Sequence, residues 1–285
     1  MSSSTGPDLE GTGSPAVTEG PLAIRLDDVA VHYRSRLNRA TSLKEHVIRT
    51  LKRDLVTEQV KALDGVSLTI EPGEIFGVVG RNGAGKSTLL KVISGIVRPT
   101  RGRVRVWGAI TPLLGVGAGF HPELTGRENV YLYSAILGRR QGETRALLSQ
   151  IVDFAELADF LDAPVRVYSK GMVARLGFAV AMAKRPDMLL LDEVLSVGDA
   201  QFREKCEARF EEHRASGTTV VLASHSAVTV RDLCTKGIWL HNGRVEASGE
   251  AGETLEAYRL FQAQRRRFAG IRSDPPSPAS AEPSP

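Results

Sequence analysis

Cysteine is scarce in this chain of 285 residues, which has only Cys206 and Cys234. The pair makes neither a disulfide framework nor a zinc-binding pattern, and it fits a reducing compartment. No uninterrupted apolar run approaches the roughly 18 residues of a membrane-spanning helix. Residues 1–20 contain no apolar core of a secretory signal. With 42% hydrophobic and 25% charged residues, the composition excludes disordered and collagen-like chains.

Basic residues gather in one segment. The formal net charge is +4 and the isoelectric point about 9.2. Residues 34–61 hold eight Lys or Arg against three Asp or Glu, a balance of +5, which leaves the other residues at −1. Ser42 as an N-cap and apolar residues at roughly helical spacing predict a basic amphipathic helix in this segment, with Leu43, Val47, Ile48, Leu51 and Leu55 on its apolar side. A solvated charged face is the alternative interpretation.

The order of elements predicts an α/β fold with a parallel core. We expect a folded body over residues 22–263 between two disordered tails, residues 1–21 and 264–285, which are rich in Ser, Gly and Pro. Predicted strands cover residues 22–33, 66–70, 75–79, 103–107, 188–191 and 218–223. Predicted helices cover residues 125–148, 172–183 and 201–215. Strands that alternate with helices are typical of a parallel sheet with crossover helices.

A phosphate-binding loop follows the apolar strand at 75–79. The segment Gly80-Arg81-Asn82-Gly83-Ala84-Gly85-Lys86-Ser87-Thr88 matches G-x-x-x-x-G-K-[ST] and leads into an apolar helical segment. Glycines let the backbone N–H groups wrap phosphate oxygens, and the helix start adds its dipole. Lys86 is expected to contact the β- and γ-phosphates of a nucleotide and Ser87 to hold Mg²⁺. Gly80, Asn82, Gly83, Gly85 and Thr88 complete the predicted nucleotide-binding set.

Acidic residues follow the second buried strand. Asp192 stands at the end of the Leu-rich run 188–191, where a carboxylate can reach Mg²⁺, and Glu193 is placed to orient or deprotonate an attacking water. His225 follows the strand at 218–223, at the same edge of the predicted sheet. We therefore assign Ser87 and Asp192 as metal ligands and Glu193 as a catalytic residue. For His225, contact with the γ-phosphate or the attacking water and a purely structural role are both open at this point.

A further helix start, Tyr168-Ser169-Lys170-Gly171-Met172, precedes Asp192. With the phosphate loop and Asp192-Glu193, this order resembles the ATP-binding subunits of ABC transporters, over roughly residues 22–263. The resemblance implies a P-loop ATPase fold with a RecA-like parallel core, an antiparallel β subdomain and a helical subdomain at about 120–180. It implies that Ser169 and Gly171 bind the γ-phosphate held by a partner subunit. The usual signature is L-S-G-G-Q, from which Lys170 and Met172 depart.

Other positions match the family one at a time. Tyr33 resembles the aromatic residue that stacks on adenine. Asp199 ends a Ser-Val-Gly-Asp segment that resembles the D-loop, which implies that Asp199 belongs to the nucleotide-binding set and links the two sites. His225 resembles the switch histidine, which implies a catalytic role. The family normally has a Gln before the helical subdomain, and neither Gln nor Glu stands near Gly115 or Val116. The resemblance therefore implies binding of ATP and Mg²⁺ with one family contact missing.

Two longer sequence segments resemble one branch of this family more than the family at large. GAGFHPELTGRENVYL at 117–132 and DEVLSVGDAQFREKC at 192–206, with the basic insertion at 34–61, resemble the branch that exports polysaccharides, O-antigens and teichoic acids. The chain then looks like a short form without a C-terminal carbohydrate-binding domain. This implies a homodimeric ATPase at the cytoplasmic face of the cell membrane that powers a separate integral membrane permease. The basic insertion would lie at the membrane surface.

Three rival functions stay open at this point. An ABC-type ATPase acting on nucleic acid or ribosomes would need a long coiled-coil insertion or a second ATPase half, and 285 residues hold neither. A GTPase would need an N-K-x-D motif, which is missing. A regulatory nucleotide-binding module would not need Lys86, Asp192, Glu193 and His225 together. We therefore expect an exporter ATPase without a nucleic-acid partner.

Overall fold

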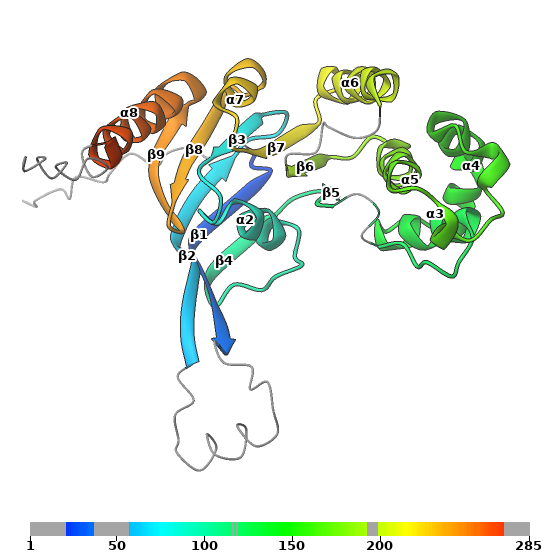
Figure 1. The fold of residues 1–285 in the computed structure, drawn as a ribbon, viewed down its shortest axis with the longest axis horizontal. Helices are drawn as coiled ribbons and strands as arrows, with labels where there is room; N and C mark the ends of the chain where they lie inside the picture. Colours follow the sequence, from blue (N-terminus) through cyan, green and yellow to red (C-terminus); the bar gives the residue numbers. More distant parts are fainter. Residues whose placement is uncertain (1–20, 37–56, 116, 118, 193–198, 271–285) are drawn as a thin grey trace, which may run out of the picture.

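The computed structural model describes residues 21–36, 57–115, 117, 119–192 and 199–270 (Figure 1). Its strands form two sheets. A six-stranded sheet has the order β5-β6-β7-β3-β8-β9, and a three-stranded sheet has the order β2-β1-β4. The strands are β1 (Ile24–Arg36), β2 (Thr57–Ile70), β3 (Ile75–Val79), β4 (Arg101–Val106), β5 (Ile110–Leu113), β6 (Met188–Asp192), β7 (Thr219–Ser224), β8 (Lys236–His241) and β9 (Arg244–Glu250).

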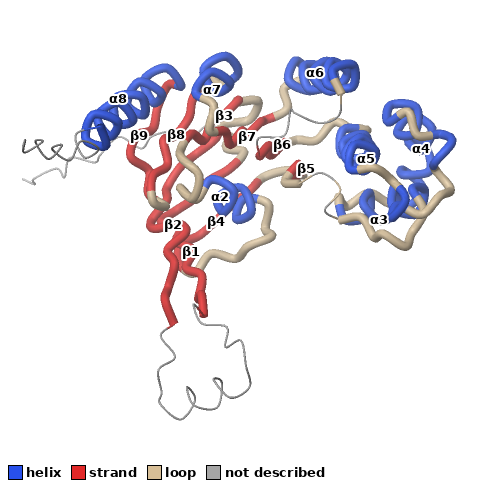
Figure 2. Tube along the Cα trace, in the orientation of Figure 1, coloured by secondary structure: helices blue, strands red, loops and turns tan. Residues whose placement is uncertain are grey.

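Helices cover both faces of the larger sheet (Figure 2). They are α2 (Lys86–Ile93), α3 (Gly126–Ile136), α4 (Gln141–Ala155), α5 (Lys170–Met182), α6 (Ala200–Ala215), α7 (Ala227–Leu233) and α8 (Ala251–Gly270), with short 3₁₀ turns at Ala158–Phe160 and Val165–Val167. The helices α3, α4 and α5 lie together at one side of the molecule (Figure 1). This group corresponds to the helical subdomain expected from the sequence.

The central strands bury both of their faces, which explains their continuous apolar sequences. From β5 to β8 they run parallel, and only β9 is antiparallel. In β6, Leu189 and Leu191 face a core shared with α3 to α6 and α8, whereas Met188 and Leu190 face a core shared with α2 and the three-stranded sheet. A strand covered on both sides needs apolar side chains at every position. The sheet is therefore a rigid base for the residues at its carboxyl edge.

The fold expectation is confirmed, and so is the strand at Ile75–Val79. The expected helix at 125–148 is wrong as a single element, because the chain turns at Gly138 (φ 78°) between α3 and α4. The structure also has β5, α7, α8 and the β8–β9 hairpin, which the sequence reading did not place. The hairpin had a recognisable signal in Asn242-Gly243, a pair that favours a tight turn with positive φ at both residues.

Two boundaries need correction. Residues 34–36 and 57–61 of the basic segment lie in β1 and β2, which pair as far as Arg36 opposite Thr57, so β1 extends beyond its predicted end at residue 33 and β2 begins before residue 66. Backbone hydrogen bonds between two long strands stabilise the extended conformation there. The predicted helical core of that segment lies outside the described residues. Residues 264–270, expected in the tail, extend α8, whose earlier turns pack Leu255 and Tyr258 into the core.

Candidate nucleotide-binding site

The phosphate-binding loop connects β3 to α2, as its sequence predicts. Gly83 has φ 80° and Gly85, the residue before the helix, has φ 108°. A Cβ on Gly85 would lie 2.5 Å from the carbonyl oxygen of Ala62, and a Cβ on Gly80 would lie 2.3 Å from that of Leu240. Only glycine permits both the conformation and the close approach. The loop is thus held against two neighbouring strands.

The turn between β8 and β9 is hydrogen-bonded to this loop. The backbone N–H of Gly243 donates to the carbonyl of Ala84 at 2.9 Å, and the N–H of Asp64 donates to the carbonyl of Gly243 at 2.8 Å. Arg244 adds a hydrogen bond to the Asp64 carboxylate at 2.7 Å, which holds the pKa of that carboxyl below its usual range. The hairpin therefore connects the phosphate loop to β2.

Lys86 is buried at the first turn of α2. Its ammonium donates to the carbonyl oxygen of Gly80 at 2.8 Å and to that of Arg81 at 3.3 Å. These contacts bend the long side chain back over the loop that it follows. A cation in that position can bind phosphate oxygens that enter the loop.

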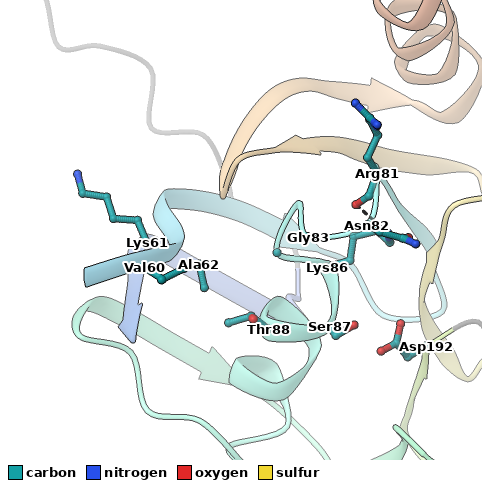
Figure 3. A pocket seen from close by; sticks show the side chains of 11 residues that line it. Val60, Lys61, Ala62, Arg81, Asn82, Gly83, Lys86, Ser87, Thr88 and Asp192 are labelled. Atoms are coloured by element: carbon teal, nitrogen blue, oxygen red, sulfur yellow. Dashed lines mark hydrogen bonds between the residues drawn. The ribbon is translucent and has the colours of Figure 1, made fainter. Parts of the chain in front are cut away.

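An open cavity of about 500 Å³ lies in front of the loop. Ligand pockets usually measure roughly 300–1,000 Å³. It is lined by loop residues and by parts of β2 and β6: Val60, Lys61, Ala62, Arg81, Asn82, Gly83, Gly85, Lys86, Ser87, Thr88 and Asp192. Figure 3 shows the side chains of Ser87 and Asp192 near each other, while those of Lys61 and Arg81 extend away. A hydroxyl and a carboxylate oxygen are ligands that suit Mg²⁺ beside a phosphate.

The carboxyl ends of three neighbouring strands lie at the sheet edge where Asp192 borders this cavity. Asp192, the last residue of β6, lies opposite Ala223 of β7, and Val79, the last residue of β3, lies opposite Ser224. His225 follows β7 directly and is exposed. The structure thus places His225 at the same sheet edge as the loop and Asp192. Glu193 and residues 194–198 lie outside the described residues.

Tyr33 does not line the cavity, although it lies close by in the sheet. It pairs across the ladder with Val60, which does line it. Directly opposite residues of an antiparallel pair project to the same face. Tyr33 is 41% exposed on that face. Its predicted stacking on adenine therefore stays a prediction. The contribution of Val60 and Ala62 was missed because β2 begins before the strand that the sequence indicated.

The predicted signature residues lie at the exposed start of α5, and none of them lines the cavity. The Ser169 hydroxyl accepts a hydrogen bond from the N–H of Met172 at 3.1 Å, which makes it the N-cap. A Cβ on Gly171 would meet nothing nearer than the Ser169 hydroxyl at 3.7 Å. This surface is open to a second molecule.

Asp199 is the N-cap of α6. Its carboxylate accepts the N–H of Phe202 at 2.9 Å and also binds Arg175 of α5. The hydrogen bond from Phe202, and after it the charge of Arg175, lower the pKa of Asp199. Asp199 therefore binds both the first turn of α6 and Arg175 of α5. Arg175 was not singled out in the sequence, since only tertiary structure brings it there.

The family's Gln was expected near Gly115 or Val116, of which the structure describes Gly115. Among the described residues 110–115, 117, 119 and 120 there is no Gln or Glu. A Cβ on Gly117 (φ 82°) would lie 2.5 Å from Val173, so this connection packs closely on α5. Beyond it, the buried amide of Asn129 donates to three backbone carbonyls and accepts the N–H of His121, which fixes residues 121–125. Asn129 is a structural residue that the sequence reading missed.

Comparison with known proteins identifies the family to which this chain belongs. The family model described as ABC transporter matches residues 63–196. The O-antigen export system ATP-binding protein RfbB of Klebsiella pneumoniae is 43% identical over 202 residues, 71% of this chain and 82% of that protein. The chain belongs to the ABC transporter family. Its fold is that of the family's ATPase subunits.

Other relatives of this ABC protein are longer than it is. The RfbB protein of Myxococcus xanthus is 42% identical over 86% of this chain and 58% of its own length. The teichoic acids export protein TagH of Listeria innocua is 42% identical over 70% of this chain and 59% of its own length. The chain thus spans less than two thirds of either protein.

Solved structures support the same fold. The post-hydrolysis dimer of the ATP-binding cassette MJ0796 bound to ADP and Pi covers 80% of this chain with a TM-score of 0.62 and 24% identity, and 98% of that chain is matched. A second dimeric structure of MJ0796, titled a bacterial ABC transporter cassette, has a TM-score of 0.61 at 25% identity over 80% of this chain and 98% of that one. Among the described residues of this ABC protein, no helix is both long and apolar enough to cross a membrane.

Proposed function

We propose that this chain is the ATP-hydrolysing subunit of an exporter for a lipid-linked polysaccharide, such as an O-antigen or a teichoic-acid-like glycan. It works as a homodimer on a separate integral membrane permease, at the cytoplasmic face of the cell membrane. The observation that carries the proposal is the phosphate loop with Lys86 and Ser87 opposite Asp192 in one cavity. The names of the O-antigen and teichoic acid export relatives support the substrate class.

The described residues supply binding and orientation. The loop glycines present N–H groups to the phosphates, and the Lys86 ammonium exchanges its carbonyl partners for phosphate oxygens. Ser87 and Asp192 would hold Mg²⁺, which would supply positive charge beside the β- and γ-phosphates. Val60 and Ala62 border the nucleoside side, with Tyr33 beside them.

Hydrolysis also needs groups that act on water. Glu193, next to Asp192 in sequence, is proposed as the base that takes a proton from the attacking water, and His225 as a contact to the γ-phosphate. Ser169 and Gly171 close the site of a second copy with a hydroxyl and a helix start. Their exposure at the start of α5 suits this role.

A set of three variants tests the proposal. Lys86→Ala is expected to lose nucleotide affinity, because the buried cation that faces the loop is removed. Glu193→Gln is expected to bind ATP normally, to form a stable dimer and to lose nearly all turnover. Lys91→Ala, an exposed cation on the same helix, is the matched control and should behave as wild type. Labelled ATP binding, phosphate release and light scattering measure the three properties.

Two results would refute these roles. Unchanged ATP binding by Lys86→Ala would exclude the phosphate-loop role, and full hydrolysis by Glu193→Gln would exclude the base. The transport half has two tests of its own. In cells that have lost the gene, we expect a lipid-linked glycan to accumulate on the cytoplasmic side. In wild-type cells, we expect the chain to co-purify from membranes with a polytopic protein. Normal glycan export without the gene would contradict the substrate assignment.

A further inference from the structure

The two-residue turn Asn242-Gly243, between β8 and β9, lies against both β2 and the phosphate loop (Figure 1). Gly243 makes the contacts on both sides. Its N–H donates to the carbonyl oxygen of Ala84 in the loop, and its carbonyl oxygen accepts the N–H of Asp64 in β2. A Cβ on Gly243 would lie 2.8 Å from the carbonyl oxygen of Ala62. The turn therefore joins the loop to the strand that borders the cavity.

Arg244, the residue after this turn, is bound to β2 by its side chain. Its Nε and one terminal nitrogen both donate to the same carboxylate oxygen of Asp64, at 3.1 and 2.7 Å. The Asp64 side chain is only 16% exposed, whereas that of Arg244 is 66% exposed. Asp64 thus holds Arg244 through its carboxylate and the turn itself through its backbone N–H. The position of the turn depends on both contacts.

The hydrogen bond to Ala84 fixes the plane of one peptide bond in the phosphate loop. Ala84 and Gly85 are joined by a trans peptide, in which the C=O and the next N–H point in opposite directions. Because the Ala84 carbonyl points to Gly243, the N–H of Gly85 points away from the turn. Gly85 lines the cavity, and among the described residues no backbone carbonyl accepts its N–H. This donor is therefore directed away from the supporting turn and can bind a ligand.

The loop does not fix this peptide plane by its own sequence. Gly83 and Gly85 both have positive φ, and glycine adopts other conformations as readily. A donor that is already oriented binds an anion more tightly, since the cost of ordering it is met when the protein folds. Hydrogen bonds to a charged acceptor such as phosphate are also the stronger ones. The contact from Gly243 thus supplies an orientation that the glycines alone do not.

We propose that Arg244 and Asp64 are positioning residues for nucleotide binding. Their ion pair holds the turn in place, and the turn directs the N–H of Gly85 toward a phosphate oxygen of the nucleotide. Neither Arg244 nor Asp64 lines the cavity, so both act through the loop rather than on the nucleotide itself. This inference rests on the proposed function, since it takes the phosphate loop to bind ATP.

Two other roles of the ion pair lead to different expectations. A simple brace would affect stability and nothing else, and exposed ion pairs contribute little even to that. An electrostatic role would run through Lys61, whose ammonium lies 3.5 Å from the same oxygen of Asp64 and which borders the cavity. Loss of Arg244 would then change nucleotide affinity only when Lys61 is present. Binding measurements on a few variants separate the three roles.

The experiment compares Arg244→Met with Arg101→Met in the full chain. Arg101 is the matched control, because it forms an exposed ion pair of 3.0 Å with Asp28 in the three-stranded sheet that also contains β2, and neither residue lines the cavity. For Arg244→Met we expect affinity for labelled ATP to fall about tenfold, which corresponds to about 1.4 kcal/mol. KM should rise by a similar factor while kcat stays within about twofold, since binding is weakened without a change in the reacting groups. Arg101→Met should keep both constants.

Further variants test the route from Arg244 to the loop. Arg244→Lys keeps the charge and should restore part of the affinity. Asp64→Asn removes the charge that Arg244 binds but keeps the backbone N–H to Gly243. It should weaken binding as Arg244→Met does, and the double variant should bind no more weakly than either single one. Arg244→Met should also lose affinity in a Lys61→Met background. Additive losses in the double variant, or no loss in the Lys61→Met background, would overturn the positioning role.

The outcomes separate this inference from the proposed function. Wild-type protein that binds ATP, together with unchanged affinity in Arg244→Met, refutes the positioning role alone. Equal losses of affinity in Arg244→Met and Arg101→Met, with equally lowered melting temperatures, also refute it, because they would indicate a general loosening of the sheet. A fall in kcat at unchanged KM contradicts a role in binding. Wild-type protein that binds no ATP refutes the proposed function and this inference together.

Discussion

Replacing Gly85 by alanine tests how closely the phosphate loop approaches β2. The structure gives φ 108° at this residue and places the new Cβ 2.5 Å from the Ala62 carbonyl oxygen, whereas such contacts essentially never fall below 3.0 Å. A left-handed conformation costs a non-glycine residue about 1–2 kcal/mol. The clash requires β2 to move, and overpacking of this kind costs about 1–3 kcal/mol. We expect Gly85→Ala to lower the free energy of unfolding by about 2–5 kcal/mol.

Gly83→Ala is the matched control in the same loop. Gly83 also has a positive φ, 80°, but a Cβ there would have no atom within 4 Å. Only the conformational cost of about 1–2 kcal/mol applies. The two variants should therefore differ by about 1–3 kcal/mol, or about 2–10 °C in melting temperature for a chain of this size. Thermal unfolding followed by circular dichroism measures the difference. Equal melting temperatures would show that the loop does not approach Ala62 so closely.

Two further predictions concern buried groups. Burial lowers the pKa of His213, whose ring N–H donates to the Met182 carbonyl. The folded pKa therefore lies below the unfolded one of about 6.5. The contribution of neutral His213 to stability is complete above that pH and falls as the pH drops below it. His213→Gln, which keeps a donor, should show a smaller drop in melting temperature between pH 7.5 and 5.5, and an equal drop would contradict this. Burial raises the pKa of Cys206 and Cys234 to about 12, so a thiol reagent should label neither until urea unfolds the chain, and fast labelling of the native protein would disprove it.

The sequence predicted the parts of the site that are built from adjacent residues. The loop from Gly80 to Ser87 carries its own conformational requirements, and the run 188–191 is apolar because both faces of β6 are covered. Such local patterns do not depend on distant contacts. They were therefore sufficient to place the loop and Asp192 at one sheet edge.

The sequence did not predict contacts between segments that are far apart in the chain. The predicted strands ended at residue 33 and began at residue 66, but β1 and β2 pair as far as Arg36 and Thr57, because ladder bonds between two long strands depend on a partner that local patterns do not reveal. For the same reason Val60 and Ala62 were not expected in the cavity. The Asn242-Gly243 turn carried a readable signal. That it supports the phosphate loop, however, depends on a contact with Ala84 that only the fold creates.

The helix α5 has two halves with different kinds of contact, and this difference favours movement at one end. From Leu176 to Met182 every residue is buried, and Arg139 donates to the carbonyl of Ala181 at 3.0 Å. The first residues, Ser169 to Gly171, are exposed, and polar contacts of Arg175 follow them. Apolar packing resists small displacements, whereas ion pairs can re-form after a shift. The buried half therefore holds α5 in place, whereas its exposed first residues are the end that can shift.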